Sequence, residues 1–367
     1  MSDESPLNDR QPPGAEQLPE AVDDEGRWQT SLAVPVLIVA IAIGLIGAII
    51  WLAREEHDAG AEALAGTTVE GPLPVTVPYR EVGGAIVIDV TFGDDSRTVP
   101  MVLDTGAPTI ISEDLAATFA GDVLGTIAGA SADGQVITSD VVRLPQVAIG
   151  EAVFREVGAV VGAIEPGNPF YCLTEGGFIG ASLMQAASWR VDPEAGTVTI
   201  ATSVDDLETT GAARLDFTRS SDVSPSPLFE LEAGEGTLSV LADTGADSWL
   251  AVHPEDLDGL GLEPPAEVPT VSVLGTSSAG AFTTRIGWLD VPVALEGVPL
   301  ATHVAASEAL PRGQGIAGTD FLGHFALTID WDEAVSYTHL RAHETALRIS
   351  YAVFCLKRGG GGGGGGG

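Results

Sequence analysis

An internal repeat is the feature of this 367-residue sequence that most constrains its fold. The segment 101–112 (MVLDTGAPTIIS) has a counterpart at 239–252 (SVLADTGADSWLAV). Each contains an Asp-Thr-Gly string, and the two aspartates, Asp104 and Asp243, are 139 positions apart. Each string ends one apolar run and precedes another, so we expect each aspartate on a loop held between buried strands.

A second pair of segments repeats at almost the same spacing. The segment 177–192 (GFIGASLMQAASWRVD) matches 315–330 (GIAGTDFLGHFALTID) at an offset of 138 positions. Two separate motifs at nearly one offset indicate a duplicated unit. We therefore predict two similar lobes, at residues 72–203 and 204–334.

Short apolar runs separated by glycine and aspartate turns fill both units. The run 84–92 (GAIVIDVTF), the turn GDDS and the run TVPMVLD predict a β-hairpin, and LFELEA, a Gly-Glu-Gly turn and TLSVLAD repeat this plan in the second unit. Outside the N-terminal region, only residues 113–119, 182–187 and 320–325 look like short helices. The predicted fold class is mainly β.

The N-terminal region has a different composition. Residues 1–30 are polar and acidic, with too few large apolar side chains to offset the entropy cost of ordering, so we expect a disordered tail. No charge occurs from Leu32 to Leu52, a length that crosses about 30 Å of hydrocarbon as a helix. We predict a single transmembrane helix at 31–53, followed by a linker at 54–71.

The basic residues around this span give its orientation. Arg10 and Arg27 precede it and Arg54 follows it, a small excess that favours a cytoplasmic N-terminus. A cleaved signal peptide is the alternative, but the apolar run is long and starts far from Met1. We expect a single-pass protein of the cell membrane whose globular part lies outside the cytoplasm.

The last stretch of the sequence, 335–367, resembles a translated sequencing adapter followed by polyglycine. We therefore expect it to be foreign to the fold and the natural sequence to end near Ala334. The first unit closes with the strand-like run 196–200 (GTVTI), and its equivalent in the second unit would fall where this tail begins. We therefore expect the second unit to lack that strand, which would expose a sheet edge.

Charge and motifs exclude several classes of function. The formal net charge of −36 disfavours nucleic acid and anionic lipid surfaces as partners. The sequence contains no HExxH, GxSxG or P-loop motif, and its histidines are scattered. We expect no metal and no cofactor.

Two carboxylates brought together carry a recognisable chemistry. Like charges a few ångströms apart cannot both ionise, so Asp104 and Asp243 would share one proton. The ionised member could then take a proton from a bound water, while the protonated member donates a hydrogen bond to the peptide carbonyl that the water attacks. We expect Thr105 and Thr244 to bond across the junction of the lobes, and Gly106 and Gly245 to let the backbone turn closely.

The DTGA strings at 104–107 and 243–246, with the glycine strings ending at Gly180 and Gly318, resemble the retropepsin and pepsin superfamily of aspartic proteases. The resemblance covers nearly all of residues 72–334. It implies a bacterial-type, membrane-anchored member with two retropepsin-like β-barrel lobes, in which the two glycines buttress the catalytic loops. It also implies glycine-tipped flaps at 127–138 and 273–284, with candidate glycines Gly129, Gly134, Gly275 and Gly280.

Two positions depart from the family pattern. Pro108 follows the first DTGA, where the family usually has a small hydroxylated residue, and Asp247 stands at the equivalent place in the second copy. The added carboxylate either raises the affinity of the pair for protons or points to solvent.

The function predicted from these residues is that of an aspartic endopeptidase acting on a polypeptide substrate. The alternative is a non-catalytic peptide-binding or sensor module with the same two-lobed fold, since a fold alone does not fix function. Single-lobe relatives pair between chains, but two near-equal lobes joined by a short linker favour pairing within one chain, and so a monomer.

Overall fold

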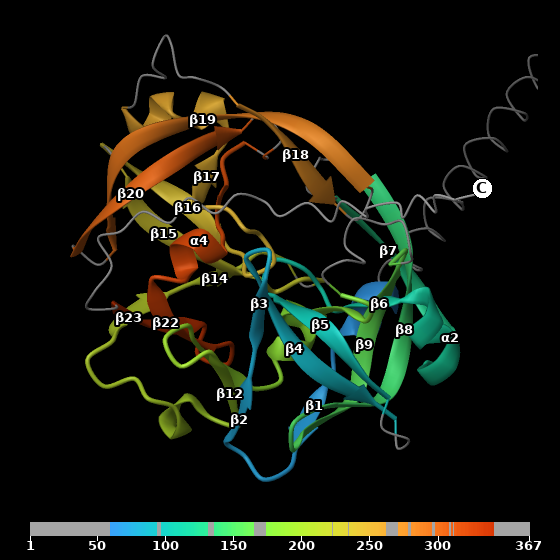
Figure 1. Ribbon diagram of the computed structural model, residues 1–367. Coiled ribbons are helices and arrows are strands. Elements are labelled where there is room, and N and C mark those ends of the chain that lie inside the picture. Colours follow the sequence, from blue (N-terminus) through green and yellow to red (C-terminus); the bar gives the residue numbers. More distant parts are fainter. Residues whose placement is uncertain are drawn as a thin grey trace, which may run out of the picture. The chain divides into compact units, whose positions relative to one another are not determined.

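The computed structural model describes residues 59–340, except 94–96, 131–135, 165–173, 222, 234, 262–270, 278–279, 296–297, 308–309 and 311. Strands dominate this part of the chain, so the predicted mainly β class is confirmed (Figure 1). The predicted acidic tail and transmembrane helix lie outside the described residues, as do residues 341–367 of the predicted foreign tail. Within the described residues no helix is long and apolar enough to cross a membrane.

The first repeat unit forms a nine-stranded sheet. Its core order is β4-β5-β10-β6-β9, and β8 pairs with both β4 and β9, so the hydrogen-bonded path returns to its start. Its strands are β1 (Thr68–Glu70), β3 (Arg80–Val82), β4 (Ala85–Phe92), β5 (Arg97–Asp104), β6 (Ile110–Ser112), β7 (Val123–Ala130), β8 (Val136–Ile149), β9 (Ala152–Gly162) and β10 (Gly177–Gly180).

The second repeat unit forms an eight-stranded sheet with the same plan. Its core order is β15-β16-β21-β17-β20, and β19 pairs with both β20 and β15. Its strands are β14 (Thr218–Arg219), β15 (Pro227–Ala233), β16 (Gly236–Ala242), β17 (Leu250–Val252), β18 (Val271–Ser277), β19 (Gly280–Leu295), β20 (Val298–Ser307) and β21 (Gly315–Ala317). The shared strand order is what a sequence duplication requires.

Both predicted hairpins are present. The strands β4 and β5 pair antiparallel, as do β15 and β16, and most of their apolar side chains are buried in the core. The helices are short: α2 (Glu113–Phe119), α3 (Ala181–Met184), α4 (Thr319–Leu322), and the 3-10 turns η2 (Val204–Asp206), η3 (Pro254–Asp256) and η4 (Asp258–Leu260). The Ser112 hydroxyl caps α2 by accepting the amide of Leu115.

A third, six-stranded sheet joins the two units in the order β13-β23-β22-β11-β12-β2. At its centre β11 and β22 pair antiparallel, with Arg190 directly opposite Thr328. These two residues occupy the same place in the repeat, 138 positions apart. Equivalent residues face each other in this way only across an approximate two-fold axis. The strands are β2 (Val75–Pro78), β11 (Ser188–Asp192), β12 (Thr197–Ala201), β13 (Ala213–Asp216), β22 (Phe325–Asp330) and β23 (Val335–Leu340).

Strand β23 corrects one expectation. The second unit does have its closing strand, because residues 335–340 pair with β22 on one side and with β13 on the other. Backbone hydrogen bonding depends little on side-chain identity, so a sequence that looks foreign still completes the sheet. Its side chains fit less well, since the hydroxyls of Ser336 and Thr338 are buried without a hydrogen-bond partner.

The predicted linker is also more ordered than its composition suggests. Residues 59–64 are helical and Leu64 is buried. A Cβ placed on Gly158 of β9 would lie 2.1 Å from the carbonyl oxygen of Ala63, and Arg143 donates a hydrogen bond to that oxygen at 3.0 Å. This short helix therefore packs directly on the first sheet.

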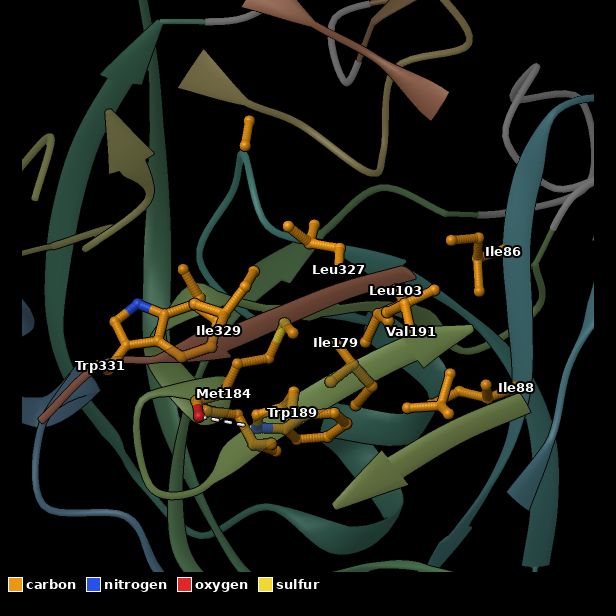
Figure 2. Packing of buried hydrophobic residues seen from close by; sticks show 14 of the residues in the cluster. Ile86, Ile88, Leu103, Ile179, Met184, Trp189, Val191, Leu327, Ile329 and Trp331 are labelled. Atoms are coloured by element: carbon orange, nitrogen blue, oxygen red, sulfur yellow. Dashed lines mark hydrogen bonds between the residues drawn. The ribbon is translucent and has the colours of Figure 1, made fainter. Parts of the chain in front are cut away.

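One hydrophobic cluster contains residues of both units and of the joining sheet. Figure 2 shows Trp189 of β11 at its centre, with its indole N–H donating to the Met184 carbonyl at 2.8 Å. Leu327 and Ile329 of β22 pack in the same cluster, which ties the joining sheet to the core of the first unit.

Candidate active site

Each DTG loop is positioned by a strand arrangement that occurs twice. In the first unit β10 lies between β5, with which it is parallel, and β6, with which it is antiparallel. Asp104 ends β5, opposite Gly180. In the second unit β21 lies in the same way between β16 and β17, and the Asp243 amide donates to the Ala317 carbonyl at 2.9 Å. Both aspartates therefore leave the ends of buried strands.

The two threonines lock the loops to each other. The Thr105 hydroxyl donates to the Ala242 carbonyl at 2.6 Å and accepts the Thr244 amide at 3.0 Å. The Thr244 hydroxyl donates to the Leu103 carbonyl at 2.8 Å and accepts the Thr105 amide at 3.0 Å. All four bonds are buried, and each has its mirror image in the other unit. The structure thus brings Thr105 and Thr244 together as the sequence predicts.

The glycines of the two strings bring the aspartates within reach of one another. A Cβ placed on Gly106 would lie 2.4 Å from Cγ of Asp243, and one placed on Gly245 would lie 2.4 Å from Cγ of Asp104. Only residues without a side chain fit there, because real Cβ atoms do not approach so closely. The carboxyl groups of Asp104 and Asp243 form a hydrogen bond with each other.

Amide groups of the same loops hold both carboxylates in place. The Gly106 amide donates to Oδ1 of Asp104, and the Gly245 amide donates to Oδ1 of Asp243, each at 2.9 Å. These matching bonds orient the two side chains in the same way relative to their own loops. The geometry is that of two fixed carboxyls facing each other.

Burial governs the electrostatics of this pair. It raises the pKa of Asp104 well above the ordinary value, and the charge of Asp243 and the hydrogen bond to it raise the pKa further, against the amide bonds that lower it. Burial also raises the pKa of Asp243, although amide donors and the hydrogen bond from Asp104 oppose that shift. The pair therefore holds one proton to a higher pH than an ordinary carboxyl does.

The two predicted buttressing glycines lie against the DTG loops. A Cβ on Gly180 would meet the carbonyl carbon of Pro108 at 2.2 Å, and a Cβ on Gly318 would meet the carbonyl oxygen of Ser248 at 2.4 Å. The amide of the residue after each glycine donates to the DTGA alanine, from Ala181 to Ala107 and from Thr319 to Ala246, both at 2.8 Å.

Two buried hydroxyl groups that we did not single out support the first loop. The Ser182 hydroxyl accepts the Thr109 amide at 2.9 Å, and the Thr109 hydroxyl accepts the Gly180 amide at 3.2 Å. In the second loop the Thr319 hydroxyl donates to the Ala246 carbonyl at 3.0 Å. The available signal was their position one or two residues after the DTGA and glycine strings.

The flap candidates lie in two long hairpins. Strands β7 and β8 pair up to Ala130 and Val136, and β18 and β19 pair up to Ser277 and Gly280. These hairpins carry Gly129, Gly275 and Gly280, whereas Gly134 lies outside the described residues. Their role over a substrate stays a prediction.

The two departures from the family pattern occupy equivalent places in the loops. Pro108 is half-buried, and Asp247 has an exposed side chain. The surrounding protein nevertheless desolvates the Asp247 carboxyl enough to raise its pKa.

Comparison with known proteins agrees with this arrangement. Residues 88–183 match the family model described as aspartyl protease, a segment that runs from β4 to α3 and includes Asp104 and Gly180. No curated protein matches the chain significantly. Over residues 88–183, the chain is therefore similar to the aspartyl protease family.

Proposed function

We propose that this protein is a membrane-anchored aspartic endopeptidase whose catalytic groups are Asp104 and Asp243. The observation that carries the proposal is the close approach of these two carboxyl groups, each held within 2.4 Å of the place where a Cβ on the glycine of the other DTG loop would lie. The aspartyl protease family match over residues 88–183 supports the reaction class. The second aspartate lies beyond that match, so its role follows from the repeat.

The proposed reaction uses a water between the two carboxyls. The ionised carboxylate takes a proton from the water as its oxygen attacks the peptide carbonyl carbon, and the protonated carboxyl donates its proton to the carbonyl oxygen. In the second step the gem-diol collapses, one hydroxyl proton returns to a carboxylate, and the amine leaves with a proton from the other carboxyl. Proton transfer of this kind works best when the pKa of the pair is raised toward the working pH, as burial does here.

We further propose that the two units are retropepsin-like lobes that pair within one chain. The closed pairing path in each unit supports two barrels, and the four threonine bonds support a single-chain active site. An extended polypeptide bound across both loops is the substrate that such a site fits. The apolar run from Leu32 to Leu52 supports an anchor in the cell membrane, with the lobes outside the cytoplasm.

Cleavage of peptides by the full-length chain in detergent tests the catalytic assignment. We expect Asp104→Asn and Asp243→Asn each to lower kcat at least about 10²-fold, the scale of lost acid–base catalysis. Asp205→Asn, which changes an exposed carboxyl in η2, is the matched control and should retain wild-type activity. Activity that survives either active-site change would exclude a shared pair. Peptide binding without cleavage by any form, from acidic to neutral pH, would favour a binding module.

A further inference from the structure

The catalytic loops are alike in backbone but unlike in charge. Their hydrogen bonds repeat from one unit to the other, as do the contacts of Gly180 and Gly318. Directly after the DTGA strings this symmetry ends, because the first loop has Pro108 and the second has Asp247. A proline side chain carries no charge and its nitrogen donates no hydrogen bond, so only the second loop presents an ionisable group at this place.

Backbone contacts from both units fix the position of Asp247. The preceding carbonyl, of Ala246, accepts the amide and the hydroxyl of Thr319 at 2.8 and 3.0 Å. On its other side the β3–β4 turn of the first unit reaches toward α4 (Figure 1), and a Cβ on Gly84 would lie 2.9 Å from Cβ of Asp247. Gly84 has a φ of +84°, so a glycine is favoured at this close approach.

Asp247 lies close to the reacting groups. It follows Gly245 by two positions, so their Cα atoms are at most about 7.6 Å apart. Gly245 itself abuts the carboxyl of Asp104. The Asp247 side chain is nevertheless exposed, unlike that of Asp104. A polypeptide held at the catalytic pair would therefore pass within reach of the Asp247 carboxyl.

No described cation neutralises this carboxyl. Other surface carboxylates have arginine partners, such as Asp89 with Arg80 at 2.9 Å and Asp114 with Arg97 at 2.8 Å. Within the part of the chain whose side chains the structure describes, Asp247 has no such ion pair, and no cation contributes to its pKa. Unpaired carboxylates are common in a chain this acidic, so the position of Asp247 beside the active site is what distinguishes it.

We infer that Asp247 is a specificity-determining residue that selects a cationic side chain, Arg or Lys, in the substrate on the second-unit side of the scissile bond. This inference rests on the proposed function. The carboxylate attracts the cation, and partial removal of water around it strengthens that attraction. Because Pro108 offers no counterpart, the preference should occur on one side only, and it would fix the direction in which a peptide binds to an otherwise two-fold site.

The test compares arginine with citrulline, its uncharged isostere. Pools of short peptides carry one or the other at a single position, and kcat/KM is measured for the full-length protein at the highest pH at which it remains active. For wild type we expect a preference of about 3- to 10-fold for arginine at one position, the scale of a partly screened ion pair. Asp247→Asn should reduce this ratio to about 1, whereas Asp205→Asn should leave it unchanged.

A mirror-image variant checks the geometry independently. Pro108→Asp should create a second arginine preference on the opposite side of the scissile bond, and Pro108→Asn should not. The preference for arginine over citrulline can also be measured without cleavage. For this we compare the dissociation constants of fluorescent arginine and citrulline peptides bound to Asp104→Asn. Equal ratios in wild type and Asp247→Asn would overturn the inference. Absence of cleavage together with a retained binding preference would instead refute the endopeptidase assignment alone.

Discussion

Replacing Thr105 with valine tests whether the two units are held together through their DTG loops. Valine keeps the shape of threonine but has no hydroxyl, so the variant loses the bond to the Ala242 carbonyl and the bond from the Thr244 amide. Both partners are buried and would be left unsatisfied, at a cost of about 1–3 kcal/mol each. The expected loss is therefore about 2–6 kcal/mol, a large part of the roughly 5–15 kcal/mol that stabilises a typical domain.

Urea-induced unfolding, followed by tryptophan fluorescence, measures this loss. Thr105→Ser is the matched control, because it keeps both hydrogen bonds and removes only one methyl group, worth about 1 kcal/mol. Thr244→Val should lose a similar free energy of unfolding, since its hydroxyl makes the mirror-image bonds. The reasoning fails if Thr105→Val unfolds at the same urea concentration as Thr105→Ser.

Three further predictions concern Asp104, strand β23 and the 59–64 helix. Asp104→Asn should make the fold more stable than wild type at neutral and higher pH but not in acid. The reason is that the pKa of Asp104 is raised in the folded protein. A carboxyl of this kind contributes its full stability below its unfolded pKa, about 3.9, and the wild-type protein loses that contribution as the pH rises through the folded pKa. Melting temperatures of both proteins across pH would show this, and parallel curves would contradict it. Thr338→Val removes a buried hydroxyl without a partner in β23 and should raise the free energy of unfolding by about 1 kcal/mol; an unchanged or lower value would argue that the hydroxyl is satisfied in solution. Leu64→Ala should lower the free energy of unfolding by about 2–4 kcal/mol, because Leu64 is buried where the 59–64 helix packs on the first sheet. An unchanged free energy of unfolding would indicate an ordinary linker.

The repeat predicted the centre of the molecule well. The pairing of Thr105 with Thr244, and the contacts of Gly180 and Gly318 with the DTG loops, follow from placing two copies of one unit around a two-fold axis. Both hairpins could also be predicted, because in each the two strands are short apolar runs, adjacent in sequence and separated by a turn that contains glycine. Local patterns and duplication together were sufficient for this part.

The joining sheet and the docked helix could not be predicted. Strand β2 pairs with β12 more than a hundred residues later, and no local pattern specifies a register over that distance. Residues 59–64 have the composition of a linker, and only the fit of Leu64 and Ala63 against the first sheet shows otherwise. Strand β23 was missed because its side chains suggested a foreign sequence, whereas its backbone pairs with β22 as an ordinary antiparallel strand.

The two DTG loops match in backbone but differ in charge at one position, Pro108 in the first loop and Asp247 in the second. Two loops with matching backbone hydrogen bonds bring the two carboxyl groups together, but a polypeptide has a direction and no two-fold axis of its own. A site that bound a polypeptide through symmetric contacts alone would accept both chain directions. A contact that differs between the two units is needed for one direction to be preferred. The difference between Pro108 and Asp247 lies where the two loops are alike in backbone. In our proposal, the charge of Asp247 distinguishes the two orientations, and Asp247 is not among the groups that shift the pKa of Asp104 or Asp243. If Asp247→Asn made the enzyme cleave sequences in which the arginine lies on either side equally well, the orientation role would be established in the same assay.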